Sequence, residues 1–334
     1  MFALLIAGCR PALPEPITIE SEDGYLIEYA EEECPFEIAA DAEITCGYMT
    51  TPEDRSNPDG PTVDIAVAIL HSLGEDPAPD PVLYLEGGPG GSALAYPEDW
   101  LVSPLLETRD IILFDQRGTG FSWPSLDCEE TDAYDAGDYG DFETRLDAVE
   151  ACRQRLRDEG IDLSAYNSAA SAADVADLRQ ILDIDEWNLY GISYGTRLAL
   201  TILRDHPEGV RSVVIDSVYP PNANGYVEDA RISVDAIQAL LDGCAADAAC
   251  AEAFPDLTAR FLDALVELEE APLLLDEEGA ALPPDTPLDD WIYEYTGVDV
   301  FNTLVDLLYD TSAIAALPLA IDSLADGDLE RWFA

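Results

Sequence analysis

The pentapeptide Gly191-Ile192-Ser193-Tyr194-Gly195 could present a serine nucleophile at a sharp turn. A short apolar run precedes it, and a helix with one apolar face is expected after it, so the serine falls between a strand and a helix. At such a strand-to-helix turn the serine must adopt a strained backbone conformation, which pushes its Oγ into a cleft. The glycines two residues before and after the serine remove Cβ atoms that would collide with neighbouring backbone. The pattern predicts nucleophilic catalysis by Ser193 through an acyl-enzyme.

A serine nucleophile needs a general base, normally histidine, and the chain contains two histidines. His206 follows the helix that begins after Ser193, so it is expected at the far end of that helix. His71 ends an early strand. We interpret both as structural. Asp216 ends the next strand and is interpreted as a turn residue, with a catalytic acid as the alternative.

Alternating apolar runs and helical patterns predict the elements that position this turn. Strands are expected near 45–50, 63–70, 81–85, 109–114 and 210–216, besides the run before Ser193. An amphipathic helix is expected at 171–183, and the acidic stretch 127–165 is also expected to be helical. Strands that alternate with helices indicate an α/β fold with a mostly parallel, doubly wound sheet. From about residue 226 the pattern is helical, with no further strand run, which indicates a second domain.

Two glycine-rich motifs accompany the pentapeptide: EGGPGGS at 86–92 and DQRGTGFS at 115–122. Together the three motifs resemble the α/β-hydrolase family of proline iminopeptidases and tripeptidyl aminopeptidases, over roughly residues 34–330. The resemblance implies an α/β-hydrolase core at 34–225 and an inserted, incomplete helical cap at 226–334. It also implies a serine exopeptidase that needs no cofactor. Its partner would be a peptide substrate with a free N-terminus, from which it removes single residues or short peptides.

The roles of the remaining site residues follow from this resemblance. The backbone N–H groups of Tyr194 and Gly88 are expected to form the oxyanion hole. Glu86 stands where many relatives have histidine, which leaves these donors intact but changes the packing of the loop. Asp115 and Arg117 are expected to act structurally, holding the loop through an ion pair of Arg117. Charge at the cleft mouth is the alternative role.

The order of catalytic residues in this fold is Ser, then Asp or Glu, then His, and the family places the last two beyond the cap. The resemblance therefore implies that the catalytic Asp and His lie beyond residue 334. It also implies that the last strands of the sheet are missing and that the chain as given is inactive. We keep two alternatives: an esterase or amidase of the same fold, and a non-catalytic binding protein.

The charge balance limits the possible partners. The chain has 334 residues, of which 70 are acidic and 15 are basic, all arginine, for a formal net charge of −55. Such a surface repels nucleic acid and anionic membranes, so neither is an expected partner. It is typical of a protein that stays soluble in high salt, and binding of cationic substrates is the alternative. We expect a monomer.

The N-terminal segment and the cysteines bear on the compartment. Residues 6–9 (Ile-Ala-Gly-Cys) resemble a bacterial lipobox, so residues 1–9 are interpreted as the remnant of an export signal with Cys9 as a lipidation site. This would make the protein an exported envelope lipoprotein or a secreted protein, and an ordinary cytoplasmic start is the alternative. Residues 10–33, rich in Pro and Glu, are expected to be an acidic tether. The other six cysteines suit disulfides, and among the possible pairings we favour nearest neighbours: Cys34–Cys46, Cys128–Cys152 and Cys244–Cys250. No cysteine–histidine cluster has zinc spacing, so no metal site is expected.

Overall fold

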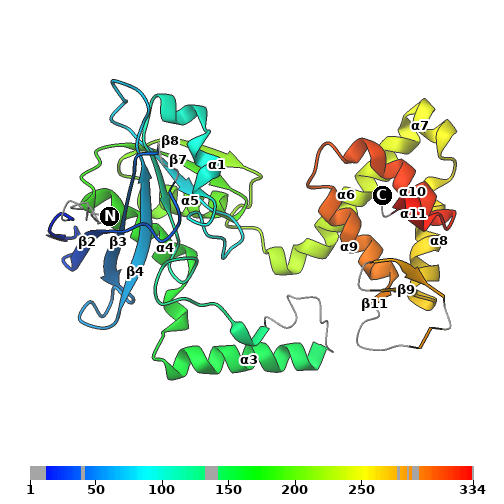
Figure 1. Cartoon of the computed structure of the whole chain (residues 1–334), viewed down its shortest axis with the longest axis horizontal. Coiled ribbons are helices and arrows are strands. Elements are labelled where there is room, and N and C mark those ends of the chain that lie inside the picture. Colours follow the sequence, from blue (N-terminus) through cyan, green and yellow to red (C-terminus); the bar gives the residue numbers. More distant parts are fainter. Residues whose placement is uncertain are drawn as a thin grey trace, which may run out of the picture. The chain divides into compact units, whose positions relative to one another are not determined.

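The computed structural model describes residues 13–38, 42–131, 142–276, 279–283, 286–287 and 293–332. These residues divide into two compact units, one ending at Ala223 and the other beginning at Asn224 (Figure 1). Residues 1–9, with the expected lipidation site Cys9, and the first three residues of the expected tether lie outside the described residues.

The first unit is built on one mixed sheet with the strand order β1-β2-β3-β4-β6-β5-β7-β8. The strands are β1 Ile17–Glu20, β2 Leu26–Glu32, β3 Ile44–Pro52, β4 Thr62–Leu70, β5 Val82–Leu85, β6 Ile111–Phe114, β7 Trp187–Ile192 and β8 Val210–Asp216. Strands β1 to β4 pair antiparallel, as do β4 and β6. Strands β6, β5, β7 and β8 pair in parallel. The parallel half is the part that the alternating pattern predicted, and its strand ends carry all three motifs.

The expected tether at 10–33 is wrong for most of its described length. Strands β1 and β2 form a hairpin, and β2 pairs with β3. In β2 the side chains alternate, with Ile27 and Tyr29 buried while Leu26 and Glu28 are exposed. This period of two is typical of a strand with one buried face. The glutamates on its exposed face made the segment look like an acidic tether when it was judged by composition.

Helices cover both faces of this sheet. The helices of this unit are α1 Pro97–Leu101, α3 Phe142–Asp158, α4 Ser168–Ile181 and α5 Tyr194–Asp205, with short 3-10 helices at Pro104–Glu107, Glu129–Thr131 and Leu163–Ala165. Helix α3 packs against the 3-10 helix at Glu129–Thr131. Helices α4 and α5 pack against each other and over one face of the sheet, where Leu178, Leu198 and Ile202 are buried. Trp100 of α1 and Leu106 pack in a separate cluster with residues of the opposite face. The result is a three-layer α/β unit.

The second unit has its own hydrophobic core, built mainly from helices. The helices are α6 Gly225–Ala246, α7 Ala248–Ala253, α8 Leu257–Glu270, α9 Gly297–Leu307, α10 Leu317–Ala325 and α11 Leu329–Trp332, with a 3-10 helix at Ile314–Ala316. A small antiparallel sheet in the order β10-β9-β11 joins them, formed by Ala281–Leu282, Leu273–Leu275 and Tyr293–Tyr295. The expectation of no strand beyond residue 226 is therefore wrong. These strands are only two or three residues long, too short to give a periodic signal.

Three disulfides form, and each joins nearest neighbours in the sequence. They are Cys34–Cys46, Cys128–Cys152 and Cys244–Cys250. Disulfides of this kind persist in oxidising compartments. Within the described ranges, no helix has both the length and the apolar character needed to cross a membrane.

Candidate active site

Ser193 lies at the turn between β7 and α5, as the pattern predicted. Its backbone is in the left-handed region, with φ 52° and ψ −118°, and its residue is exposed. The Ser193 N–H donates to the carbonyl of Asp216 at 2.9 Å, and Thr196 Oγ1 donates to the carbonyl of Ser193 at 2.6 Å. A non-glycine residue with this φ is strained, so the surrounding structure must hold it in place.

The two flanking glycines are required by contacts with backbone. A Cβ on Gly195 would lie 1.9 Å from the carbonyl oxygen of Leu85, and one on Gly191 would lie 2.4 Å from the carbonyl oxygen of Gly195. Both contacts are with backbone oxygens, which cannot move aside as the end of a flexible side chain could. Strand β7 and helix α5 can therefore approach each other, and β5, closely enough to form the turn only with glycine at both positions.

The loop after β5 lies against the nucleophile. A Cβ on Gly87 would lie 3.2 Å from the Cβ of Ser193, which places the loop in van der Waals contact with the serine. Glu86 holds this loop, since its Oε1 accepts the Gly87 N–H at 2.6 Å and its Oε2 accepts the Tyr84 hydroxyl at 3.1 Å. Gln116 Nε2 donates to the carbonyl of Glu86 at 3.1 Å.

Two backbone donors remain available beside the serine. Gly88 is exposed, has φ +104°, and its N–H has no acceptor among the described residues. Tyr194 is the first residue of α5, so its N–H has no acceptor within the helix. Both belong to segments that flank Ser193, which is the arrangement that an oxyanion hole requires.

Asp115 ties the glycine-rich loop to the turn after β6. The residue is completely buried and accepts hydrogen bonds from Ser92 Oγ at 2.9 Å, the Leu94 N–H at 3.1 Å and the Phe121 N–H at 2.8 Å. Burial raises the pKa of Asp115, although these hydrogen bonds oppose the shift. The geometry assigns Asp115 to support of the loop.

Arg117 makes an ion pair, and its partner is Asp174 on α4. Arg117 Nε and Nη2 donate to the two oxygens of Asp174 at 2.8 and 2.7 Å, and both side chains are 1% exposed. Arg55 joins them with contacts of 2.6 Å to Asp174 and to Asp177. Burial alone would raise the pKa of Asp174, but the two guanidinium groups outweigh it and lower that pKa. Sequence reasoning missed Asp174 as the partner of Arg117, and Arg55 and Asp177 as the other members of this cluster, because these residues come from three separate parts of the chain.

Neither histidine lies at the site. His206 caps the carboxyl end of α5, a 12-residue helix that begins beside Ser193 and spans roughly 18 Å. His71 follows Leu70, which pairs with Ile111 at the start of β6. It therefore lies beside the amino ends of the parallel strands, whereas Ser193 lies at their carboxyl ends. Its Nε2 lies 2.8 Å from Thr45 Oγ1.

The backbone of Asp216 contacts the turn at Gly191–Gly195, which we call the elbow. Its carbonyl accepts the Ser193 N–H, while its exposed carboxylate accepts from Ser217 Oγ at 3.1 Å and from the Tyr190 hydroxyl at 3.5 Å. No histidine contacts this carboxylate in the described part of the chain. The structure thus brings together Ser193, Gly88 and Tyr194, and keeps both histidines away from them.

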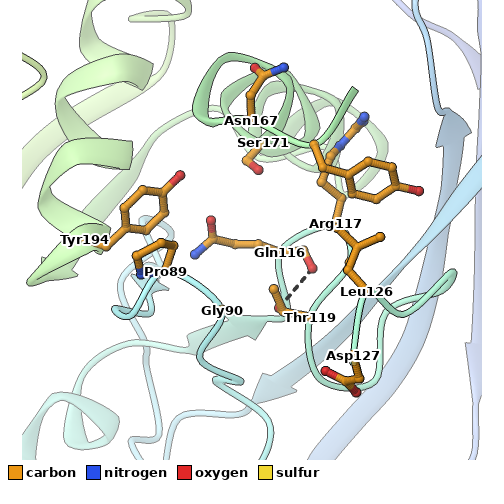
Figure 2. A pocket seen from close by; sticks show the side chains of 12 residues that line it. Pro89, Gly90, Gln116, Arg117, Thr119, Leu126, Asp127, Asn167, Ser171 and Tyr194 are labelled. Atoms are coloured by element: carbon orange, nitrogen blue, oxygen red, sulfur yellow. Dashed lines mark hydrogen bonds between the residues drawn. The ribbon is translucent and has the colours of Figure 1, made fainter. Parts of the chain in front are cut away.

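A cavity of about 280 Å³ is lined by Tyr194 and by Pro89, the residue after Gly88 (Figure 2). It lies between the Pro89–Gly90 segment, the turn at 116–119, the amino end of α4 and the side chain of Tyr194. The Tyr194 hydroxyl and Ser168 Oγ are 2.7 Å apart, which fixes the tyrosine ring as one wall. The lining residues are Pro89, Gly90, Gln116, Arg117, Gly118, Thr119, Leu126, Asp127, Tyr166, Asn167, Ser171 and Tyr194.

The fold and the elbow define an α/β hydrolase. The family described as alpha/beta hydrolase fold matches residues 80–288, more than half of the chain, so the chain belongs to this family and the expected fold is confirmed. The chain is 27% identical to a tripeptidyl aminopeptidase of Streptomyces lividans over 219 residues, which are 61% of this chain and 41% of the relative. It is 29% identical to a proline iminopeptidase of Arabidopsis thaliana over 160 residues, 47% of this chain and 32% of the relative.

Among solved structures, an alpha/beta hydrolase fold protein from Chitinophaga pinensis matches with a TM-score of 0.36 and 18% identity. The match covers 60% of this chain and 52% of that one. The chain spans about two fifths of the length of the curated relatives it matches.

Proposed function

We propose that this chain carries the nucleophile and the oxyanion hole of a serine hydrolase that cleaves peptides at their N-terminal end. The observation that carries the proposal is the backbone of Ser193, held at φ 52° between glycines that admit no Cβ and against the Gly87 loop. Such strain persists where the surrounding structure over-determines it, which is common at active sites.

The proposed chemistry runs through an acyl-enzyme. Ser193 Oγ attacks the substrate carbonyl, and the N–H groups of Gly88 and Tyr194 stabilise the oxyanion of the tetrahedral intermediate. The amine leaves with a proton, and water then releases the acyl group from Ser193. Neither His71 nor His206 is assigned as the base, so we propose that residues 1–334 alone hydrolyse slowly. Binding and the oxyanion hole would supply roughly 10³-fold over water.

The proposed substrate is a peptide with a free N-terminus. Support comes from the similarity to a tripeptidyl aminopeptidase and to a proline iminopeptidase. The net charge of −55 is compatible with a substrate that carries an ammonium group. We further propose that the protein is exported, which the three disulfides support, that Cys9 is its lipid anchor, and that it is a monomer.

The test compares three substrates: a tripeptide p-nitroanilide with a free N-terminus, its N-acetylated form, and a p-nitrophenyl butyrate ester. Release of nitroaniline from the free peptide above the Ser193→Ala level, with little from the acetylated form, supports the proposal. Turnover of the ester alone would favour an esterase. Equal rates for the protein and Ser193→Ala with all three substrates would rule out catalysis by Ser193.

A further inference from the structure

The cavity beside Tyr194 contains polar groups that the protein itself leaves unused. Ser171 is 4% exposed, and its hydroxyl makes no hydrogen bond within the described residues. Gln116 is 5% exposed; its Nε2 donates to Glu86, while its Oε1 accepts no hydrogen bond from the described residues. Figure 2 shows the Gln116 amide and the Ser171 hydroxyl directed into the same space, next to Tyr194. Both side chains are more than nine-tenths buried, yet these two oxygens open onto the cavity without a partner among the described residues, so a ligand in the cavity can reach them.

The other polar lining groups are already engaged. Both Nε and Nη2 of Arg117 bond to Asp174, and Asn167 Oδ1 caps α4 by accepting the N–H groups of Ala169 and Ala170. Leu126 and the ring of Tyr166 supply apolar wall. Apart from the carboxylate of the exposed Asp127, the cavity therefore offers one free acceptor, Gln116 Oε1, and one free hydroxyl, that of Ser171, within a partly apolar space.

The position of the cavity indicates which part of a substrate it would take. Its walls include Pro89, directly after one oxyanion donor, and Tyr194, which is the other donor. The attacked carbonyl would sit between those donors, so the residue that owns this carbonyl lies nearest to the cavity. The side chain of this acyl residue is therefore the part of the substrate that we place in the cavity.

We propose that this cavity binds the side chain of the substrate residue whose carbonyl is attacked, and that Gln116 and Ser171 select an uncharged side chain ending in an amide. This inference rests on the proposed function. Gln116 Oε1 accepts from the amide NH₂ of that side chain, and the Ser171 hydroxyl donates to its carbonyl. A volume of about 280 Å³ is large enough for a side chain of glutamine size.

The test measures binding to the Ser193→Ala protein, so that no turnover is needed. The probes are Ala-Ala-Gln amide and Ala-Ala-Met amide, which have similar length and differ in the hydrogen-bonding tip. Calorimetric titration is expected to give about 3–10-fold tighter binding of the glutamine peptide, the range of one or two net hydrogen bonds. Adding Ser171→Ala should reduce that preference to about twofold or less and leave the methionine peptide unchanged.

Ser164→Ala is the matched control, because Ser164 is exposed, bonds only locally to Asp162 and does not line the cavity. It should keep the full preference. Ser171→Ala should fold normally and melt at the same or a higher temperature, since it removes an unpartnered hydroxyl from a helix. Equal affinity for both peptides, no binding of either, or a preference that survives Ser171→Ala would overturn the inference. A glutamine preference in a protein that fails the hydrolysis test would show that the cavity binds an amide side chain, but it would overturn both the proposed function and the assignment of that side chain to the attacked residue.

Discussion

Replacing Asp174 by asparagine tests whether the buried arginine cluster holds the site together. In the native protein the carboxylate receives two hydrogen bonds from Arg117, at 2.8 and 2.7 Å, and one from Arg55, at 2.6 Å. With asparagine the charge disappears, and Arg117, whose side chain is 1% exposed, keeps an unpaired buried charge. Breaking one partner of a buried ion pair costs about 3–5 kcal/mol. Because the asparagine oxygen can still accept one hydrogen bond, we expect a loss near 3 kcal/mol.

Urea unfolding followed by tryptophan fluorescence measures this loss, since Trp187 is buried in the same unit. Glu150→Gln is the matched control: its partner Arg153 lies at 2.6 Å, but the two side chains are 60% and 48% exposed. Such surface pairs contribute about 0–1 kcal/mol. If Asp174→Asn and Glu150→Gln changed the free energy of unfolding by the same small amount, the argument that Arg117 depends on Asp174 would be refuted.

Three further predictions concern the elbow, the loop and the surface. Gly195→Ala should displace β5 from α5 and abolish any reaction of Ser193, because its Cβ would lie 1.9 Å from the Leu85 oxygen. The control is Gly243→Ala, whose Cβ would have nothing within 4 Å, so its melting temperature in calorimetry should be unchanged or higher. Burial raises the pKa of Asp115, so the native state binds its proton more tightly than the unfolded state, and this contribution to stability is full below about pH 4 and falls as the pH rises. The free energy of unfolding that Asp115→Asn loses relative to the wild type, measured by urea titration, should therefore be smaller at pH 7 than at pH 4. A loss that grew with pH would contradict the raised pKa of Asp115. Finally, with a net charge of −55, the melting temperature should rise between 0.01 and 1 M NaCl, as the Debye length shrinks from roughly 30 to 3 Å; a constant or falling value would show that self-repulsion is unimportant.

The parts of the site that are local in sequence were predictable. The elbow needs only five consecutive residues with a strand before and a helix after, and the structure places Ser193 at that turn. The three disulfides join cysteines that are neighbours in the sequence. In each case the interacting residues are close along the chain, so their spacing in the sequence is enough to predict the contact.

The parts assembled from distant segments were not predictable. Arg55, Arg117 and Asp174 come from three regions, and only the folded sheet brings them together. A signal was present, since Asp174 and Asp177 occupy the same helix face as the buried Val175 and Leu178. Carboxylates are rarely buried without partners, so two of them on an apolar face already indicated buried cations.

The central claim, that Ser193 is a preorganised nucleophile beside two backbone donors, is tested most directly by the site of reaction with a fluorophosphonate. The chain has no lysine, so trypsin cuts only after arginine and releases residues 180–197 with Ser193 as their single serine. We predict one phosphonyl adduct, on this peptide, absent from Ser193→Ala. An oxyanion hole contributes about 10²-fold over an ordinary exposed serine even where the base is missing. Adducts spread over several serines, or an adduct that persists in Ser193→Ala, would contradict the account.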